Sequence, residues 1–148
     1  MYIYVLFVHI AAAVMGLGAA FAFPLIAKSA KTVSQAKFVL SLLHRLEILP
    51  KVGSILLLLT GIAMAILEPS LFKAGWFIAS IVIYLAVQVI VVGILPKQMN
   101  KQLKIVNAQK GENLPESYKQ LSRLSAKWES VTHAAAFLLI LLMVFKPF

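Results

Sequence analysis

The chain has 148 residues, of which 61% are hydrophobic, and this fraction exceeds the ~45–50% that is typical of soluble globular domains. It contains no cysteine, which excludes disulfides, thiolate metal sites and thiolate haem ligation. The net charge of +9 comes from Lys and Arg residues gathered in two connecting segments, a distribution that indicates cytoplasmic loops and argues against a nucleic-acid partner.

Four apolar blocks predict four helices that cross a membrane. About 20 residues are needed to span the hydrocarbon core, and lipid offers no partner for unpaired backbone groups, so each block must be helical. We place the spans at about residues 2–27, 38–67, 75–95 and 127–146. The sequence therefore predicts an all-α fold, an integral membrane four-helix bundle formed by residues 1–148 as a single domain. No inverted repeat or pair of broken helices is evident.

The first span contains an ionisable residue, His9, inside its apolar stretch. His9 shares one helical face with Ala12, Gly16 and Ala20, at spacings of three and four residues. Small residues at this spacing let another helix approach closely. We therefore expect His9 to face the bundle interior, where an ionisable side chain normally has a partner or a ligand.

The second span carries polar side chains on one face near its start. His44, Glu47, Lys51 and Ser54 follow one another at spacings of three and four residues. This pattern predicts an ion-pair cluster around Glu47 at the level of the inner headgroups. We also expect Pro50 to bend this helix, because proline cannot donate the helical hydrogen bond.

The third span has a polar stripe that recurs every fourth residue, formed by Trp76, Ser80, Tyr84 and Gln88. We expect the stripe to face the interior and to form hydrogen bonds across helices. Two interpretations are open: the stripe holds the helices together, with Trp76 as an interfacial anchor, or it lines a cofactor site.

The fourth span contains the third histidine, His133, which lies six residues beyond Lys127 and roughly 9 Å inside the boundary at ~1.5 Å per residue. Its depth matches that of Gln88. Neutral imidazole is a good ligand for iron, so three histidines on three helices suit haem ligation. We predict haem b with His9 and His133 as the axial pair and His44 as a substitute. The candidate cofactor-binding residues are His9, His133, His44, Ser80, Tyr84 and Gln88.

The connecting segments set the orientation. Basic residues are dense in the loops 28–37 and 96–127 and sparse around Glu68–Lys73, so positive-inside counting places both loops in the cytoplasm and both termini outside. Residues 96–109 and 116–127 have helical composition, so spans three and four are expected to extend beyond the lipid as a hairpin. Its lysines could contact anionic headgroups, each contributing on the order of 1 kcal/mol. The predicted location is the bacterial inner membrane.

Two motifs carry a family resemblance. His9-Ile10 is followed by a small-residue helix that closes with Phe23-Pro24, and the third span opens with Gly75-Trp76. In these motifs and in layout the chain resembles the oxygen-independent, haem-binding protoporphyrinogen-oxidase family and the related copper-resistance D-type membrane domain. Its architecture is most similar to small bacterial four-span proteins of the same superfamily.

The resemblance implies a role for the first histidine and weakens the case for catalysis. The family's first-span histidine is a haem ligand, which corresponds to His9. The family has a lysine four residues after the Gly-Trp tryptophan, where this chain has Ser80, and an arginine after the first-span proline, where Leu25 follows. The missing cations disfavour porphyrinogen oxidation, so whether the chain is an enzyme stays open.

The sequence favours a haem b-binding membrane protein for electron transfer, haem handling or sensing. The first alternative is a non-catalytic accessory subunit or scaffold of a larger membrane complex, in contact through the small-residue face and the basic hairpin. A third function is transport of a small solute or metal ion, which four short spans could perform only as an oligomer. The expected partners are the lipid bilayer and a membrane protein or further copies of the chain.

Overall fold

The computed structural model describes residues 1–148 and confirms the all-α class. Its elements are α1 (Tyr2–Lys28), α2 (Val33–Leu46), α3 (Ile48–Leu67), the 3-10 helix η1 (Pro69–Lys73), α4 (Gly75–Gln88), the π-helical segment η2 (Val89–Ile94), α5 (Leu95–Ala108) and α6 (Glu116–Phe145). They form four spans long and apolar enough to cross a membrane: α1, α2 with α3, α4 with η2 and α5, and α6.

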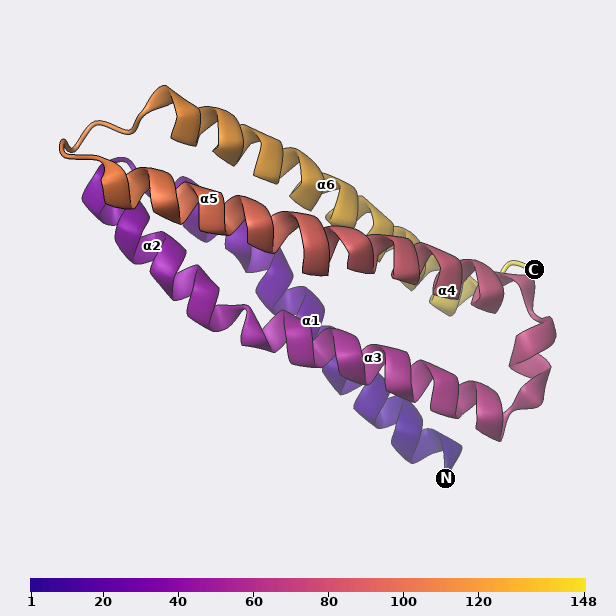
Figure 1. Cartoon of the computed structure of the whole chain (residues 1–148). Coiled ribbons are helices and arrows are strands. Elements are labelled where there is room, and N and C mark those ends of the chain that lie inside the picture. The colour runs from indigo at the N-terminus through magenta and orange to yellow at the C-terminus, as the bar shows by residue number, and fades with distance from the viewer.

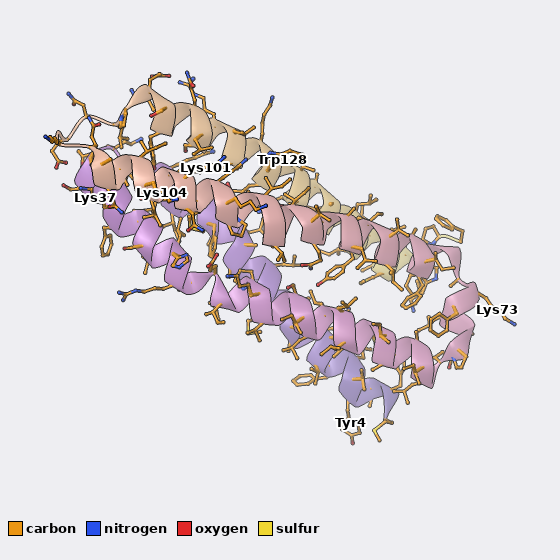
Figure 2. All side chains as sticks on the ribbon, in the orientation of Figure 1. Tyr4, Lys37, Lys73, Lys101, Lys104 and Trp128 are labelled. Atoms are coloured by element: carbon orange, nitrogen blue, oxygen red, sulfur yellow. The ribbon has the colours of Figure 1, made fainter.

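The four spans run lengthwise beside one another (Figure 1). The two chain ends and η1 lie at one end of the bundle, which we call the terminal end. The α1–α2 and α5–α6 connections lie at the other, the basic end, where Figure 2 shows Lys37, Lys101 and Lys104, whereas Lys73 lies at the terminal end. The predicted helical hairpin is present, because α5 and the first part of α6 lie beside each other at the basic end.

The closest helix packing is between α1 and α3. The buried residues of α1 are His9, Ala12 and Gly16, as the spacing of small residues predicts. Gly16 meets Gly53 of α3 so closely that a Cβ atom built on Gly53 would lie 2.7 Å from the Gly16 Cα. The two glycines therefore let the backbones touch, which is how small residues stabilise helix pairs in lipid.

The second span starts earlier than predicted and is not continuous. Thr32 caps α2 by accepting a hydrogen bond from the Gln35 amide at 3.3 Å, so the predicted loop 28–37 is reduced to a short turn. The helix is interrupted at Glu47, between α2 and α3. Pro50 explains the break, because it cannot donate to the carbonyl four residues before it and its ring clashes with that carbonyl.

The third span also contains an irregular segment that the sequence analysis did not predict. In η2 the hydrogen bonding widens, and the Leu95 amide donates to the Ile90 carbonyl, five residues back. Pro96 follows at once, in the first turn of α5. Since Pro96 removes one helical donor, the local adjustment re-satisfies the backbone. The irregularity of span two was thus expected from Pro50, whereas that of span three was not.

The tightest core lies at the basic end, where α2 packs on α5 and α5 on α6. It centres on Ala36 and Val106, both fully buried, and includes Leu40, Leu43 and Tyr118. Toward the terminal end the spans associate as two pairs, α1 with α3 and α4 with α6. A hydrogen bond from the Tyr84 hydroxyl to the Ser54 carbonyl links the two pairs.

Candidate functional site

His9 lies within the α1–α3 contact and is 8% exposed. Its Nδ1 is 2.7 Å from the Thr60 hydroxyl oxygen of α3, which itself donates to the Leu56 carbonyl. Because Thr60 donates there, the geometry is satisfied when His9 Nδ1–H donates to the Thr60 oxygen. A Cβ atom on Gly61 would lie 3.8 Å from the His9 ring, so the ring is enclosed by α3.

Of the polar stripe of the third span, one side chain, Tyr84, forms a hydrogen bond to another helix. Ser80 is 3% exposed and donates to the Trp76 carbonyl one turn before it, at 2.8 Å. The Tyr84 hydroxyl donates across to α3, as expected for a stripe that holds helices together. Gln88, the last member, is half-buried.

His133 is held against α1 by two contacts. Its Nε2 is 3.3 Å from the Ala20 carbonyl oxygen, and its ring stacks on Phe21 with centroids 4.4 Å apart. Ala20 is eleven residues from His9 along α1, a separation of roughly 16 Å at 1.5 Å per residue. The axial ligands of one haem lie on either side of a single iron atom. The structure therefore does not bring His9 and His133 together as a pair, and these residues do not fit a bis-histidine haem.

His44 belongs to the ion-pair cluster that its spacing predicts. Its Nδ1 is 3.2 Å from the Glu47 carboxylate, and the Lys51 ammonium is 2.8 Å from the same oxygen. The side chain of His44 is 54% exposed, whereas that of Glu47 is 13% exposed. His44 thus lies on the surface. In the chain as a whole, no group of three or more His, Cys, Asp or Glu side chains is arranged to hold a metal ion.

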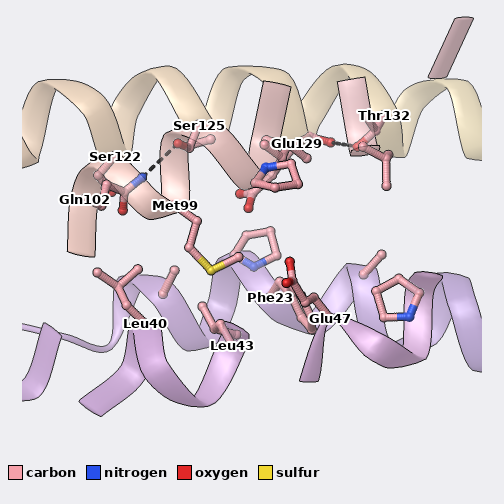
Figure 3. A pocket seen from close by; sticks show the side chains of 18 of the residues that line it. Phe23, Leu40, Leu43, Glu47, Met99, Gln102, Ser122, Ser125, Glu129 and Thr132 are labelled. Carbon is pink, nitrogen blue, oxygen red and sulfur yellow. Dashed lines mark hydrogen bonds between the residues drawn. The ribbon is translucent and has the colours of Figure 1, made fainter. Parts of the chain in front are cut away.

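A cavity of about 290 Å³ lies between the spans toward the basic end (Figure 3). All four spans contribute to its lining, and three of the lining residues are prolines: Pro24 inside α1, Pro50 just after the break at Glu47, and Pro96 just after η2. The η2 segment contributes Val91. Proline kinks and π-helical turns displace the backbone from regular packing, and π-helical turns are frequent at functional sites.

The walls of the cavity are mainly apolar, with a few polar groups at defined places. Figure 3 shows Phe23, Leu43 and Met99 beside two carboxylates, Glu47 from the second span and Glu129 from α6, on facing sides. Three exposed basic side chains also contribute to the lining: Lys28, Lys51 and Arg123. An apolar pocket with a few polar groups is the usual form of a small-molecule site.

A hydrogen-bonded cluster of polar side chains lies at the wall that α5 and α6 form. The Ser125 hydroxyl donates to the Gln98 side-chain oxygen at 2.7 Å, and the Gln102 amide donates to Ser125 at 2.9 Å. Both glutamines are buried. These bonds join α5 to α6 beside the cavity and fix the shape of its wall.

Of the six candidate residues named from the sequence, only His133 lines this cavity. Glu129 was not singled out, although a signal was present: it stands four residues before His133, on the same face of an apolar helix. An acidic residue at the start of an otherwise apolar span is itself a functional indication.

One family matches nearly the whole chain. Residues 3–147 match the family described as "Predicted integral membrane protein (DUF2269)". No curated protein and no solved structure matches the chain.

Proposed function

We propose that this chain, which belongs to the DUF2269 family of integral membrane proteins, binds a small solute in the cavity at its basic end and, as an oligomer, moves that solute across the membrane. The observation that carries the proposal is the cavity of about 290 Å³, to which every span contributes. The positive-inside rule predicts that the basic end faces the cytoplasm, and a solute would then enter from there.

The irregular helices support the proposal. Solute sites of membrane transporters are commonly built where helices are discontinuous, because irregular backbone is tolerated only where it is buried in protein or lines a cavity. Here the break at Glu47 and the η2 segment both lie beside the cavity, and Glu47 and Val91 line it.

The absence of cysteine allows a direct test of access to the cavity. Ala126 lines the cavity, so Ala126→Cys in inside-out vesicles should react with a small charged methanethiosulfonate reagent. The matched control is Ala36→Cys, also at the basic end but fully buried outside the cavity, which should stay unreactive. An unreactive Ala126→Cys, in vesicles where an exposed Gly111→Cys reacts, would count against a cytoplasm-facing solute site.

Haem b binding is the second candidate, favoured by the position of His133 in the cavity wall. The cavity offers only one imidazole, that of His133, so this haem site would differ from the one predicted between His9 and His133. The test is an absorption spectrum of purified protein supplied with haem. A Soret band lost in His133→Ala and kept in His9→Ala would support it, and the absence of any band would remove it.

An accessory role in a larger complex makes a different prediction. A stoichiometric membrane partner would copurify with the chain, and filling the cavity with Ala126→Phe would leave that association unchanged. A flux assay in liposomes containing the chain alone would then show no solute movement, whereas the transport proposal requires movement that Ala126→Phe abolishes.

A further inference from the structure

We infer that the solute is a small organic cation, an amine with an apolar body, and that the Glu129 carboxylate binds its charged end. The inference rests on the proposed solute site and adds the chemical class of its ligand. It follows from the charge pairing of the whole chain, from the surroundings of Glu129 and from the size of the cavity.

Glu129 differs from every other acidic residue in the chain. Five glutamates and no aspartates are present, and four of the five have a partner. Glu47 binds Lys51, Glu68 accepts from Ser70, Glu112 accepts from Ser34, and Glu116 lies near Lys119 and Arg123. The Glu129 carboxylate alone has no hydrogen-bond or salt-bridge partner in the protein.

The surroundings of Glu129 make an unpaired carboxylate unfavourable. It is half-buried and borders a cavity with apolar walls, where a charge without a partner costs free energy. Lys28 is the cation whose charge acts on it, but it is exposed and forms no salt bridge with it. A ligand ammonium in the cavity would supply the missing partner through a charge-assisted hydrogen bond.

The rest of the cavity suits the apolar body of such a ligand. Phe23 offers an aromatic ring near the carboxylates, and aromatic faces attract cations. Met99 is a flexible side chain that adapts to differently shaped apolar ligands. The second carboxylate of the lining, Glu47, is paired with Lys51. Arg123, which also lines the cavity, lies near Glu116. Glu129 is therefore the one carboxylate of the lining that is left to pair with a cationic ligand.

The volume limits the ligand to a small molecule. Ligand pockets commonly measure ~300–1,000 Å³, and this cavity, at about 290 Å³, lies at the lower end of that range. Suitable probes are therefore n-hexylamine, which is cationic at neutral pH, with n-hexanol and n-hexanoate as neutral and anionic analogues of equal length.

The experiment measures protection of Ala126→Cys from the thiol reagent, with the full chain in nanodiscs of uncharged lipid. Half-protection by n-hexylamine should need a concentration at least tenfold below that of n-hexanol, and n-hexanoate should protect least. Glu129→Gln in the same background should abolish the advantage of the amine. The control Glu68→Gln, at the terminal end and outside the cavity, should preserve it.

The outcomes separate the two proposals. If n-hexanol or n-hexanoate protects as well as the amine, or if Glu129→Gln keeps the amine's advantage, the cation inference is wrong while the solute site stands. If none of the three probes protects a cysteine that reacts readily, the solute site itself is wrong. Size-exclusion chromatography checks that Glu129→Gln, which preserves the shape of the side chain, remains folded.

Discussion

Gly53 is the residue on which the α1–α3 contact most depends. A Cβ atom there would lie 2.7 Å from the Gly16 Cα and 2.9 Å from the Ala12 carbonyl oxygen, and both are backbone atoms that cannot rotate away. Gly53→Ala should therefore push the helices apart and destabilise the fold by about 1–3 kcal/mol, the usual cost of overpacking. Unfolding of the detergent-solubilised protein, followed by circular dichroism, measures the change.

Gly18→Ala is the matched control for Gly53→Ala. Nothing lies within 4 Å of a Cβ atom at Gly18, and the residue is exposed on the outer face of α1. This variant should be neutral or stabilising by up to about 1 kcal/mol, because alanine favours the helix over glycine. Equal losses of stability in the two variants would show that the glycine contact does not hold α1 to α3.

The hydrogen bond between His9 and Thr60 gives a second prediction for single residues. Hydrogen bonds between membrane helices contribute roughly 0.6 kcal/mol on average and up to about 1.7 kcal/mol. A double-mutant cycle of His9→Ala and Thr60→Val should give a coupling energy in that range. If the cycle gives no coupling, while His9→Ala alone abolishes a bound cofactor, His9 is a ligand and not a packing residue.

Among the helices, α2 has a charged group from another segment at its N-terminus. The Glu112 backbone carbonyl accepts from the Val33 amide at 3.0 Å, and its carboxylate accepts from the Ser34 amide at 3.2 Å and from the Ser34 hydroxyl. The two hydrogen bonds from Ser34 lower the pKa of the Glu112 carboxyl below its ordinary value of 4.5. A carboxylate at this position also interacts favourably with the helix dipole.

The stabilisation by Glu112 should depend on pH. Because the pKa is lower in the folded protein, the contribution is complete above the ordinary value of 4.5 and is lost as the pH falls through the folded pKa. Glu112→Gln keeps an acceptor oxygen but has no charge. The melting temperature of the wild type should therefore exceed that of Glu112→Gln at about pH 7, and the difference should shrink toward about pH 3. A difference that stays constant over this range would contradict the assignment.

Local periodicity made most of the helices predictable. The face of α1 that carries His9 and Gly16 depends on residues within two turns of one helix, so spacing alone identifies it. The ion pairs around Glu47 also join residues only three and four positions apart, and they form although the helix breaks there. The break at Glu47 was predictable in kind, because Pro50 is visible in the sequence. The η2 segment was not, since a proline shows that a helix must adjust but not which hydrogen-bond pattern it adopts.

At the scale of the whole molecule, the residues of the cavity could not be predicted from spacing along the sequence, because they come from different spans. Glu47 and Glu129 face each other across the cavity, yet they lie far apart in the sequence on different spans. The partner of His9 is Thr60, also on another helix, so depth alone could not identify it. Residues at equal depth share a layer, but only the rotation and pairing of the helices decide which of them meet.

The pairing of the spans also gives the molecule two unlike ends, and this leads to a prediction about orientation. The basic end carries the connections after α1 and after α5, and the terminal end carries η1 with its single lysine, Lys73. Positive-inside counting therefore predicts that Lys73 faces the outside of the cell and Asn113 the cytoplasm. Since the chain has no cysteine, each position can be labelled as a single cysteine in an otherwise unchanged protein.

In intact cells, an impermeant maleimide should label Lys73→Cys and leave Asn113→Cys unmodified. Both residues are exposed, so both cysteines should react after the membrane is permeabilised, which controls for local burial. The reverse pattern would place the basic end outside. The cavity would then open away from the cytoplasm, and a solute taken from the cytoplasm could not enter it by the route proposed here.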